Sequence, residues 1–155
     1  MDNLNQLVVF TLDDQRYALR LLSVERIVRV VEITPLPKAP DIVLGIVNVQ
    51  GRVIPVVNIR KRFRLPEREI NLSDQLIIAS TSKRPVALLT DAVNAVIEQS
   101  GKRTIMSEDI MPGIKYIEGV VKLEDGLILI HDLDKFLSLE EEKALDEIMN
   151  NLRDK

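Results

Sequence analysis

Apolar residues recur at matching positions in two pairs of long segments. Residues 6–28 align without a gap with residues 75–97, at an offset of 69, and both segments have the pattern of a strand, a turn and a second strand. Residues 45–63 align in the same way with residues 119–137, at an offset of 74. Any two β-rich segments share some alternation, but two ungapped matches in the same order favour an internal duplication.

Each copy contains a strand pair, a short connection and a hairpin, and the connection of the second copy is expected over residues 107–115. In the first copy Asp13-Asp14 form the turn of the strand pair, and Gly51 can supply the positive φ of a tight hairpin. A copy of about 70 residues buries little surface alone. We therefore expect one domain over residues 1–155, in which lobes of approximately residues 6–74 and 75–137 pack on each other and can exchange strands.

Positions that are apolar in both copies should form the interior. In the first copy and then the second, they are Ile27, Val47, Val49, Val56, Val96, Val121, Leu123 and Ile130.

The tail has the pattern of a helix over residues 138–152. Ser138 and Glu141 fit a capping box, and an apolar stripe follows at helical spacing: Leu145, Ile148, Met149 and Leu152. A helix docked on its own domain is the favoured interpretation, and a partner-binding helix is the alternative.

Composition supports a β protein and excludes several kinds of chemistry. Apolar residues make up 46% of the chain but aromatic residues only 3%, so Val, Ile and Leu form most of the apolar content. The net charge of −3 gives no general attraction to nucleic acid, and the absence of Cys excludes disulfides and thiol catalysis. The chain has neither a signal-peptide pattern nor an apolar run long enough to cross a membrane. We expect a soluble, cytoplasmic protein that does not insert into membranes.

Candidate catalytic residues are few. The single histidine, His131, lies in an apolar run and is expected to be a polar residue of an edge strand. Motifs for nucleotide binding, metalloprotease chemistry or an activated serine are missing. We therefore expect no enzyme activity, no catalytic or metal-binding residues and no cofactor.

One basic cluster stands out, and it could contact phosphates. Only Phe63 could serve as an aromatic platform beside it, so a solvated turn or a protein-docking rim is favoured over nucleic-acid binding. The cluster consists of Arg60, Lys61, Arg62 and Arg64, with Arg52 nearby.

A long segment of the first copy resembles the CheW family. Residues 23–65 read SVERIVRVVEITPLPKAPDIVLGIVNVQGRVIPVVNIRKRFRL. In that family a V-x-E-I segment precedes a proline loop ending P-x-x-V-x-G, which is followed by V-I-N-L-R-G-x-I-x-P-V-V-D-L-R. Other segments are similar as well, so the resemblance covers essentially the whole chain. It implies two intertwined five-stranded β-barrels that share a hydrophobic core, with short helices and a C-terminal helix.

The resemblance also implies a function. CheW proteins are non-catalytic adaptors that couple a CheA-type histidine kinase to methyl-accepting chemoreceptors, in arrays at the membrane. The receptor-binding residues it implies here are Val24, Ile27, Asn48 and Gln50. Three positions depart from the family pattern: Gln50 replaces an Arg associated with the receptor interface, Asn58 replaces an Asp, and Thr90 interrupts an apolar strand.

The kinase-binding surface is expected around the proline loop. Leu36, Ile42 and Val43 are apolar residues among loop-forming prolines, and Gly45 would let another backbone approach closely. The resemblance implies that the kinase regulatory domain is the partner that binds this surface. The alternative function is a stand-alone regulatory or ligand-binding β domain in another signalling pathway.

Overall fold

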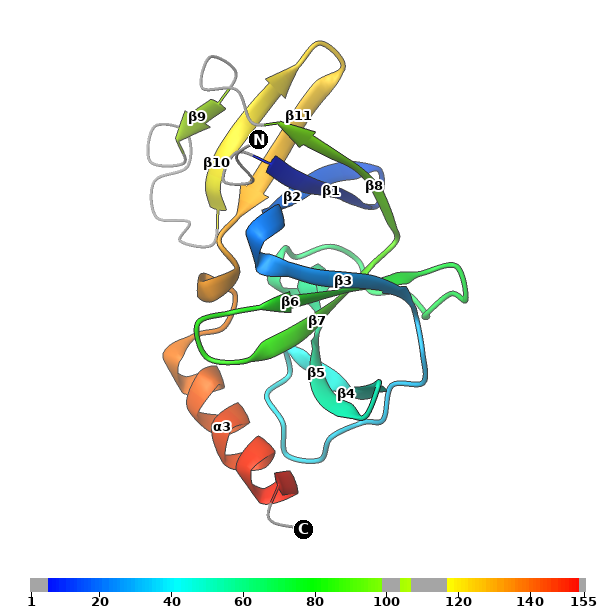
Figure 1. The fold of residues 1–155 in the computed structure, drawn as a ribbon, viewed down its shortest axis with the longest axis vertical. Helices are drawn as coiled ribbons and strands as arrows, with labels where there is room; N and C mark the ends of the chain where they lie inside the picture. The colour runs from blue at the N-terminus through cyan, green and yellow to red at the C-terminus, as the bar shows by residue number, and fades with distance from the viewer. Residues whose placement is uncertain (1–5, 99–103, 107–116, 154–155) are drawn as a thin grey trace.

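The computed structural model describes residues 6–98, 104–106 and 117–153, and these residues form two β-sheets and a C-terminal helix (Figure 1). The second copy's expected connection, residues 107–115, lies outside the described part. The first sheet has six strands in the order β8-β1-β2-β11-β10-β9. In chain order its strands are β1 (Gln6–Leu12), β2 (Gln15–Arg20), β8 (Ala92–Glu98), β9 (Thr104–Met106), β10 (Ile117–Leu123) and β11 (Gly126–His131).

The second sheet has five strands in the order β3-β6-β7-β5-β4. Its strands are β3 (Val24–Arg29), β4 (Val43–Val49), β5 (Arg52–Val57), β6 (Gln75–Ser80) and β7 (Pro85–Thr90). Between Thr34 and Ile46, two backbone hydrogen bonds of 2.8 Å join the segment after β3 to β4. The five-stranded sheet thereby curls back on itself, as a barrel does.

The two sheets have the same order of equivalent strands. By the alignment of the two copies, β1 to β5 correspond to β6, β7, β8, β10 and β11. Replacing each strand of β8-β1-β2-β11-β10 by its equivalent gives β3-β6-β7-β5-β4, and the parallel pairs β11–β2 and β5–β7 correspond too. Each sheet therefore contains strands from both halves of the sequence.

The predicted mainly β fold with two intertwined subdomains is confirmed, although one sheet has six strands rather than five, because the short β9 pairs with β10. The chain crosses between the sheets after β2 and again after β7 (Figure 1).

A single large apolar cluster lies between the sheets. Its fully buried members come from both sheets and from the C-terminal helix: Phe10, Leu12, Leu19, Ile77, Leu88 and Leu145. Smaller clusters fill the opposite face of each sheet. The central strands are therefore buried on both faces, which explains their continuous apolar runs.

Most residues predicted to be interior are buried. Val47, Val56, Val121 and Ile130 are buried, and Val49 and Leu123 pack partly buried against the smaller clusters.

The prediction is wrong for Ile27 and Val96, which are 39% and 51% exposed. They occupy equivalent positions in β3 and β8, each at the edge of its sheet. Their neighbours Val28 and Ile97 pack inwards, and alternate residues of a strand face opposite sides. The shared apolar pattern at this position marks a repeated surface feature.

Helix α3 (Leu139–Arg153) confirms the predicted C-terminal helix. The Ser138 hydroxyl accepts a hydrogen bond from the Glu141 backbone N–H (3.1 Å), and the Glu141 carboxylate accepts one from the Ser138 N–H (2.7 Å), which is a capping box. The helix packs on its own domain through Leu145, and it lies beside the five-stranded sheet (Figure 1).

Candidate docking surfaces

The residues expected to bind a receptor lie on β3 and on the β4–β5 hairpin. Ile27 projects from β3, whereas Val24 at the start of this strand is half-buried and packs against the central cluster. Asn48 and Gln50 are both exposed. The structure therefore presents three of these four side chains to solvent.

The geometry of the β4–β5 turn explains why Asn and Gly occupy positions 48 and 51. Gln50 and Gly51 have φ angles of 51° and 83°, as a two-residue turn with both residues left-handed requires. The Asn48 side chain accepts a hydrogen bond of 2.9 Å from the Gly51 N–H. This confirms the predicted role of Gly51, and it places Gln50 at the tip of a well-defined turn.

An ion pair connects this hairpin to β3. The Arg52 guanidinium lies 2.9 Å from the Glu25 carboxylate, which also accepts a 2.6 Å hydrogen bond from the Ser80 hydroxyl. The hydrogen bonds from Arg52 and then Ser80 lower the pKa of Glu25. This pair brings β3 and the hairpin to one end of the five-stranded sheet. Sequence reasoning did not connect Glu25 with Arg52, because they are far apart in the chain.

The expectation that Ile42 and Val43 offer an exposed kinase-binding surface is wrong. Both side chains are buried in the central cluster. The Val43 N–H donates to the Pro40 carbonyl (2.9 Å), and the Asn58 N–H donates to the Ile42 carbonyl (2.7 Å), so the chain turns inwards directly after the proline loop. Of the three apolar residues, only Leu36 is half-exposed.

Gly45 does allow a close backbone approach, but the approaching backbone belongs to the chain itself. A Cβ atom at position 45 would lie 2.2 Å from the Thr34 carbonyl oxygen, beside the bridge that closes the five-stranded sheet. The expectation that a partner strand approaches Gly45 is therefore wrong. A bulky residue here would disturb the fold before it disturbed any partner.

The prediction of a solvated turn is wrong for Arg60, the first residue of the basic cluster. Arg60 is the second residue of the short helix α1 (Ile59–Arg62), and its side chain is only 10% exposed. Its Nη2 atom lies 2.8 Å from Asp13 and 2.8 Å from Asp91. These hydrogen bonds, the one to Asp13 first, raise the pKa of Arg60 despite burial. Arg62 likewise pairs with Glu141 of α3, at 2.5 Å.

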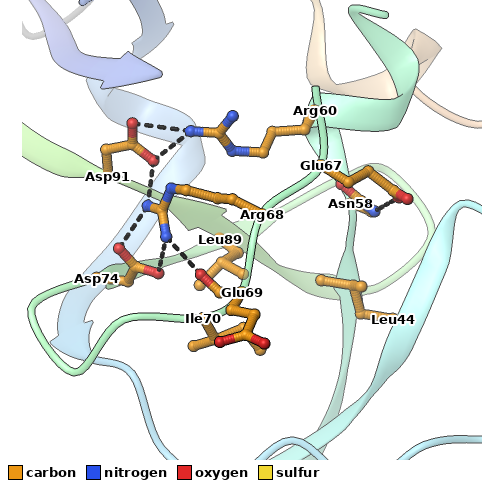
Figure 2. Close-up of a pocket in the computed structure, with 10 residues that line it drawn as sticks. All are labelled: Leu44, Asn58, Arg60, Glu67, Arg68, Glu69, Ile70, Asp74, Leu89 and Asp91. Atoms are coloured by element: carbon orange, nitrogen blue, oxygen red, sulfur yellow. Dashed lines mark hydrogen bonds and ion pairs between the residues drawn. The ribbon is translucent and has the colours of Figure 1, made fainter. Parts of the chain in front are cut away.

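Arg60 and Asp91 lie on one wall of a surface pocket of about 390 Å³ (Figure 2). Arg68 reaches the same Asp91 carboxylate (2.5 Å) and also binds the buried Asp74 (2.6 Å). Burial would raise the pKa of Asp91, but hydrogen bonds from Arg60, the Asp13 N–H and Arg68 lower it overall. Both guanidinium groups are thus bound to carboxylates, and an anionic ligand would have to displace them. Apolar side chains form another part of the lining: Leu44, Ile70 and Leu89.

The other departures from the family pattern have local explanations. The Asn58 side chain caps α1 by accepting from the Lys61 N–H (3.2 Å), as an Asp would, and it also donates to Glu67 (2.9 Å). The buried Thr90 hydroxyl donates to the Gln75 carbonyl (3.0 Å), so the polar step in β7 is satisfied.

His131 is not on an edge strand, contrary to expectation, because β11 lies between β2 and β10. Its side chain is buried among aromatic rings, with the Phe63 ring centroid 4.2 Å away and Tyr17 and Phe136 nearby. Within residues 6–98, 104–106 and 117–153, no group of three or more His, Asp or Glu side chains is placed to hold a metal ion. Helices in the same ranges are too short or too polar to span a membrane.

Two sheets around one core, with exposed apolar side chains at their edges, define a β module suited to binding other proteins. A family model described as the CheW-like domain matches residues 6–141, and the chain belongs to this family. It is 30% identical to chemotaxis protein CheW of Treponema pallidum over 90% of this chain and 86% of that protein, and 30% identical to chemotaxis protein CheW of Rhizobium meliloti over 90% and 91%.

A solved structure gives the same answer. The scaffolding protein TtCheW from Thermoanaerobacter tengcongensis matches with a TM-score of 0.80 and 28% sequence identity, over 88% of this chain and 94% of that one. These likenesses support the role of a chemotaxis adaptor.

Proposed function

We propose that this protein is a non-catalytic adaptor that binds a CheA-type histidine kinase and the cytoplasmic tip of chemoreceptors, and so joins them in one signalling assembly in the cytoplasm. Membership of the CheW-like family supports this proposal most directly. The exposed face of β3 and the β4–β5 hairpin supply surfaces of the right kind, since apolar side chains ringed by polar ones are typical of protein interfaces.

The receptor surface we propose comprises Ile27 on β3 together with Asn48 and Gln50 on the hairpin, with Val24 supporting it from below. The Glu25–Arg52 pair lies between these elements and adds charge to an otherwise apolar and amide surface. The receptor tip that the family binds is helical, and an apolar side chain flanked by polar groups suits one face of a helix.

The kinase surface we propose is the proline loop around Leu36. Ile42 and Val43 contribute indirectly, since their burial fixes the loop, and Gly45 contributes by letting the sheet close beneath it. Prolines at 35, 37 and 40 restrict the loop before binding, which reduces the entropy lost on docking.

Calorimetric titration tests the two surfaces separately. The Ile27→Asp variant should lose affinity for a receptor-tip fragment and keep affinity for the kinase regulatory domain, and Leu36→Asp should do the reverse. Val96→Asp, at the position equivalent to Ile27 in the other sheet, is the matched control and should change neither affinity. If the parent chain binds neither partner, the adaptor function is wrong, and the stand-alone ligand-binding alternative gains support.

A further inference from the structure

The internal repeat creates two equivalent junctions between the sheets. At each one, the short turn after the last strand of one copy faces the first hairpin turn of the same copy, which lies in the other sheet. In the first junction Arg60, after β5, faces Asp13 in the β1–β2 turn. The offsets of 74 and 69 make Asp134 and Ser82 their equivalents, and these two residues are again in contact.

The first junction has several contacts around the largely buried guanidinium of Arg60. Arg60 bonds to Asp13 in the six-stranded sheet and to Asp91 at the crossing from β7 to β8. Asp91 is itself fixed to the six-stranded sheet, because its carboxylate accepts from the Asp13 N–H (2.9 Å) and its N–H donates to the Thr11 carbonyl (3.1 Å). Opening this junction would leave the largely buried Arg60 guanidinium without its carboxylate partners, so the junction resists opening.

The second junction is exposed and weaker. The Asp134 carboxylate accepts a single hydrogen bond of 2.6 Å from the Ser82 N–H, and both residues are exposed to water. Helix α3 supports this side, with Arg84 of the β6–β7 turn paired to Asp146 and lying 3.6 Å from Glu142. The two junctions are equivalent in the repeat, but the contact made by Asp134 is weaker than the contacts made by Arg60.

We propose that Arg60 is a positioning residue, which with Asp13 and Asp91 fixes the angle between the two sheets. Arg60 lies in the turn directly after β5 of the five-stranded sheet. Its guanidinium bonds to Asp13 and Asp91, two carboxylates held by the six-stranded sheet. The consequence for coupling rests on the proposed function: both proposed docking surfaces lie on the five-stranded sheet, so a fixed angle sets how the six-stranded sheet is oriented relative to the bound partners.

Spin labels on the two sheets test this inference directly. The chain contains no Cys, so Val53→Cys and Leu127→Cys introduce the only thiols. These two positions are equivalent at the offset of 74, and each is the second residue of its strand, β5 or β11. Their side chains are 46% and 48% exposed. Pulsed electron paramagnetic resonance then gives the distribution of distances between the sheets without any partner present.

We expect one narrow distribution for the labelled parent and a broadened or bimodal one for Arg60→Met. Arg68→Met is the matched control, since Arg68 pairs with Asp91 and Asp74 rather than with the β1–β2 turn. This variant should lower the melting temperature while leaving the distribution narrow. Asp134→Ala, at the exposed junction, should also leave it narrow.

A narrow distribution for a folded Arg60→Met protein would overturn the inference, and so would equal broadening in Arg68→Met or Asp134→Ala. Circular dichroism establishes that each variant is folded. If Arg60→Met does not fold, Asp13→Gly takes its place: glycine accepts the φ of 50° at this turn, and the variant removes only the carboxylate. A narrow distribution in Asp13→Gly would then overturn the inference. Failure here leaves the adaptor function untouched, because partner binding is measured separately.

Discussion

The two sheets share a strand order but differ in polar chemistry at equivalent positions. The β4–β5 hairpin of the five-stranded sheet turns at Gln50-Gly51. The equivalent β10–β11 hairpin of the six-stranded sheet turns at Glu124-Asp125. Arg60 follows one hairpin, whereas Asp134 follows the other. Apolar positions and turns are therefore enough to specify the topology twice, while the surfaces have diverged. Both docking surfaces proposed above lie on the five-stranded sheet, so the six-stranded sheet supplies matched control positions.

The largest effect should come from breaking the shared interior. Val47 and its equivalent Val121 are both buried. Val47→Asp and Val121→Asp should each destabilise the protein by more than about 4 kcal/mol, because an unpaired charge would be buried. Thermal melting followed by circular dichroism measures this loss. Val53→Asp, on the exposed face of β5, is the control and should melt close to the parent; unchanged melting of Val47→Asp would contradict the assigned interior.

A second, smaller effect should appear where the five-stranded sheet closes. Gly45→Ala places a methyl group against the Thr34 carbonyl and should cost about 1–3 kcal/mol, the range for overpacking. Gly51→Asn is the control: the position is open and left-handed, and Asn tolerates such a φ. Urea titration compares the two. Equal stabilities for Gly45→Ala and the parent would show that the closure does not depend on this glycine.

The hairpin tips should differ in receptor binding. Gln50→Arg restores the residue that the family pattern has at this turn, and should change receptor affinity by roughly 1–3 kcal/mol if a carboxylate faces it. Glu124→Arg makes a matching change at the equivalent tip of the other sheet and should have no such effect. Calorimetry with a receptor-tip fragment measures both. No response at position 50, or an equal response at both tips, would remove Gln50 from the interface.

The smallest expected effect is on acid stability. The folded protein lowers the pKa of Asp91 below its ordinary 3.8, so the Asp91 carboxylate stabilises the fold at neutral pH and loses this contribution as the pH falls through the lowered value. Asp91→Asn should therefore be less stable than the parent at neutral pH, and the difference should shrink on acidification. Denaturant titrations over a pH series measure this; a constant difference would contradict the assignment.

The sequence was sufficient to predict the β class, the repeat, the hairpin turn at Gly51 and the helix cap at Ser138, because each follows from local pattern. The sequence did not predict which apolar side chains are exposed to water. Ile42 and Ile27 are both apolar, but one is buried beneath a loop and the other faces water on an edge strand. Ion pairs such as Arg60–Asp91 join residues distant in the chain, and no local pattern reveals them. The resemblance identified the candidate surfaces, and only the structure separated supporting residues from exposed ones.

Sedimentation of a three-component mixture tests the adaptor role most directly. The kinase regulatory domain and a receptor-tip fragment are mixed with and without this protein. We predict that a complex containing all three components forms only when the protein is present, and that Ile27→Asp leaves the kinase–adaptor pair while losing the receptor. If the two partners instead compete for the protein, or if neither associates with it, the account of a bridging adaptor is contradicted.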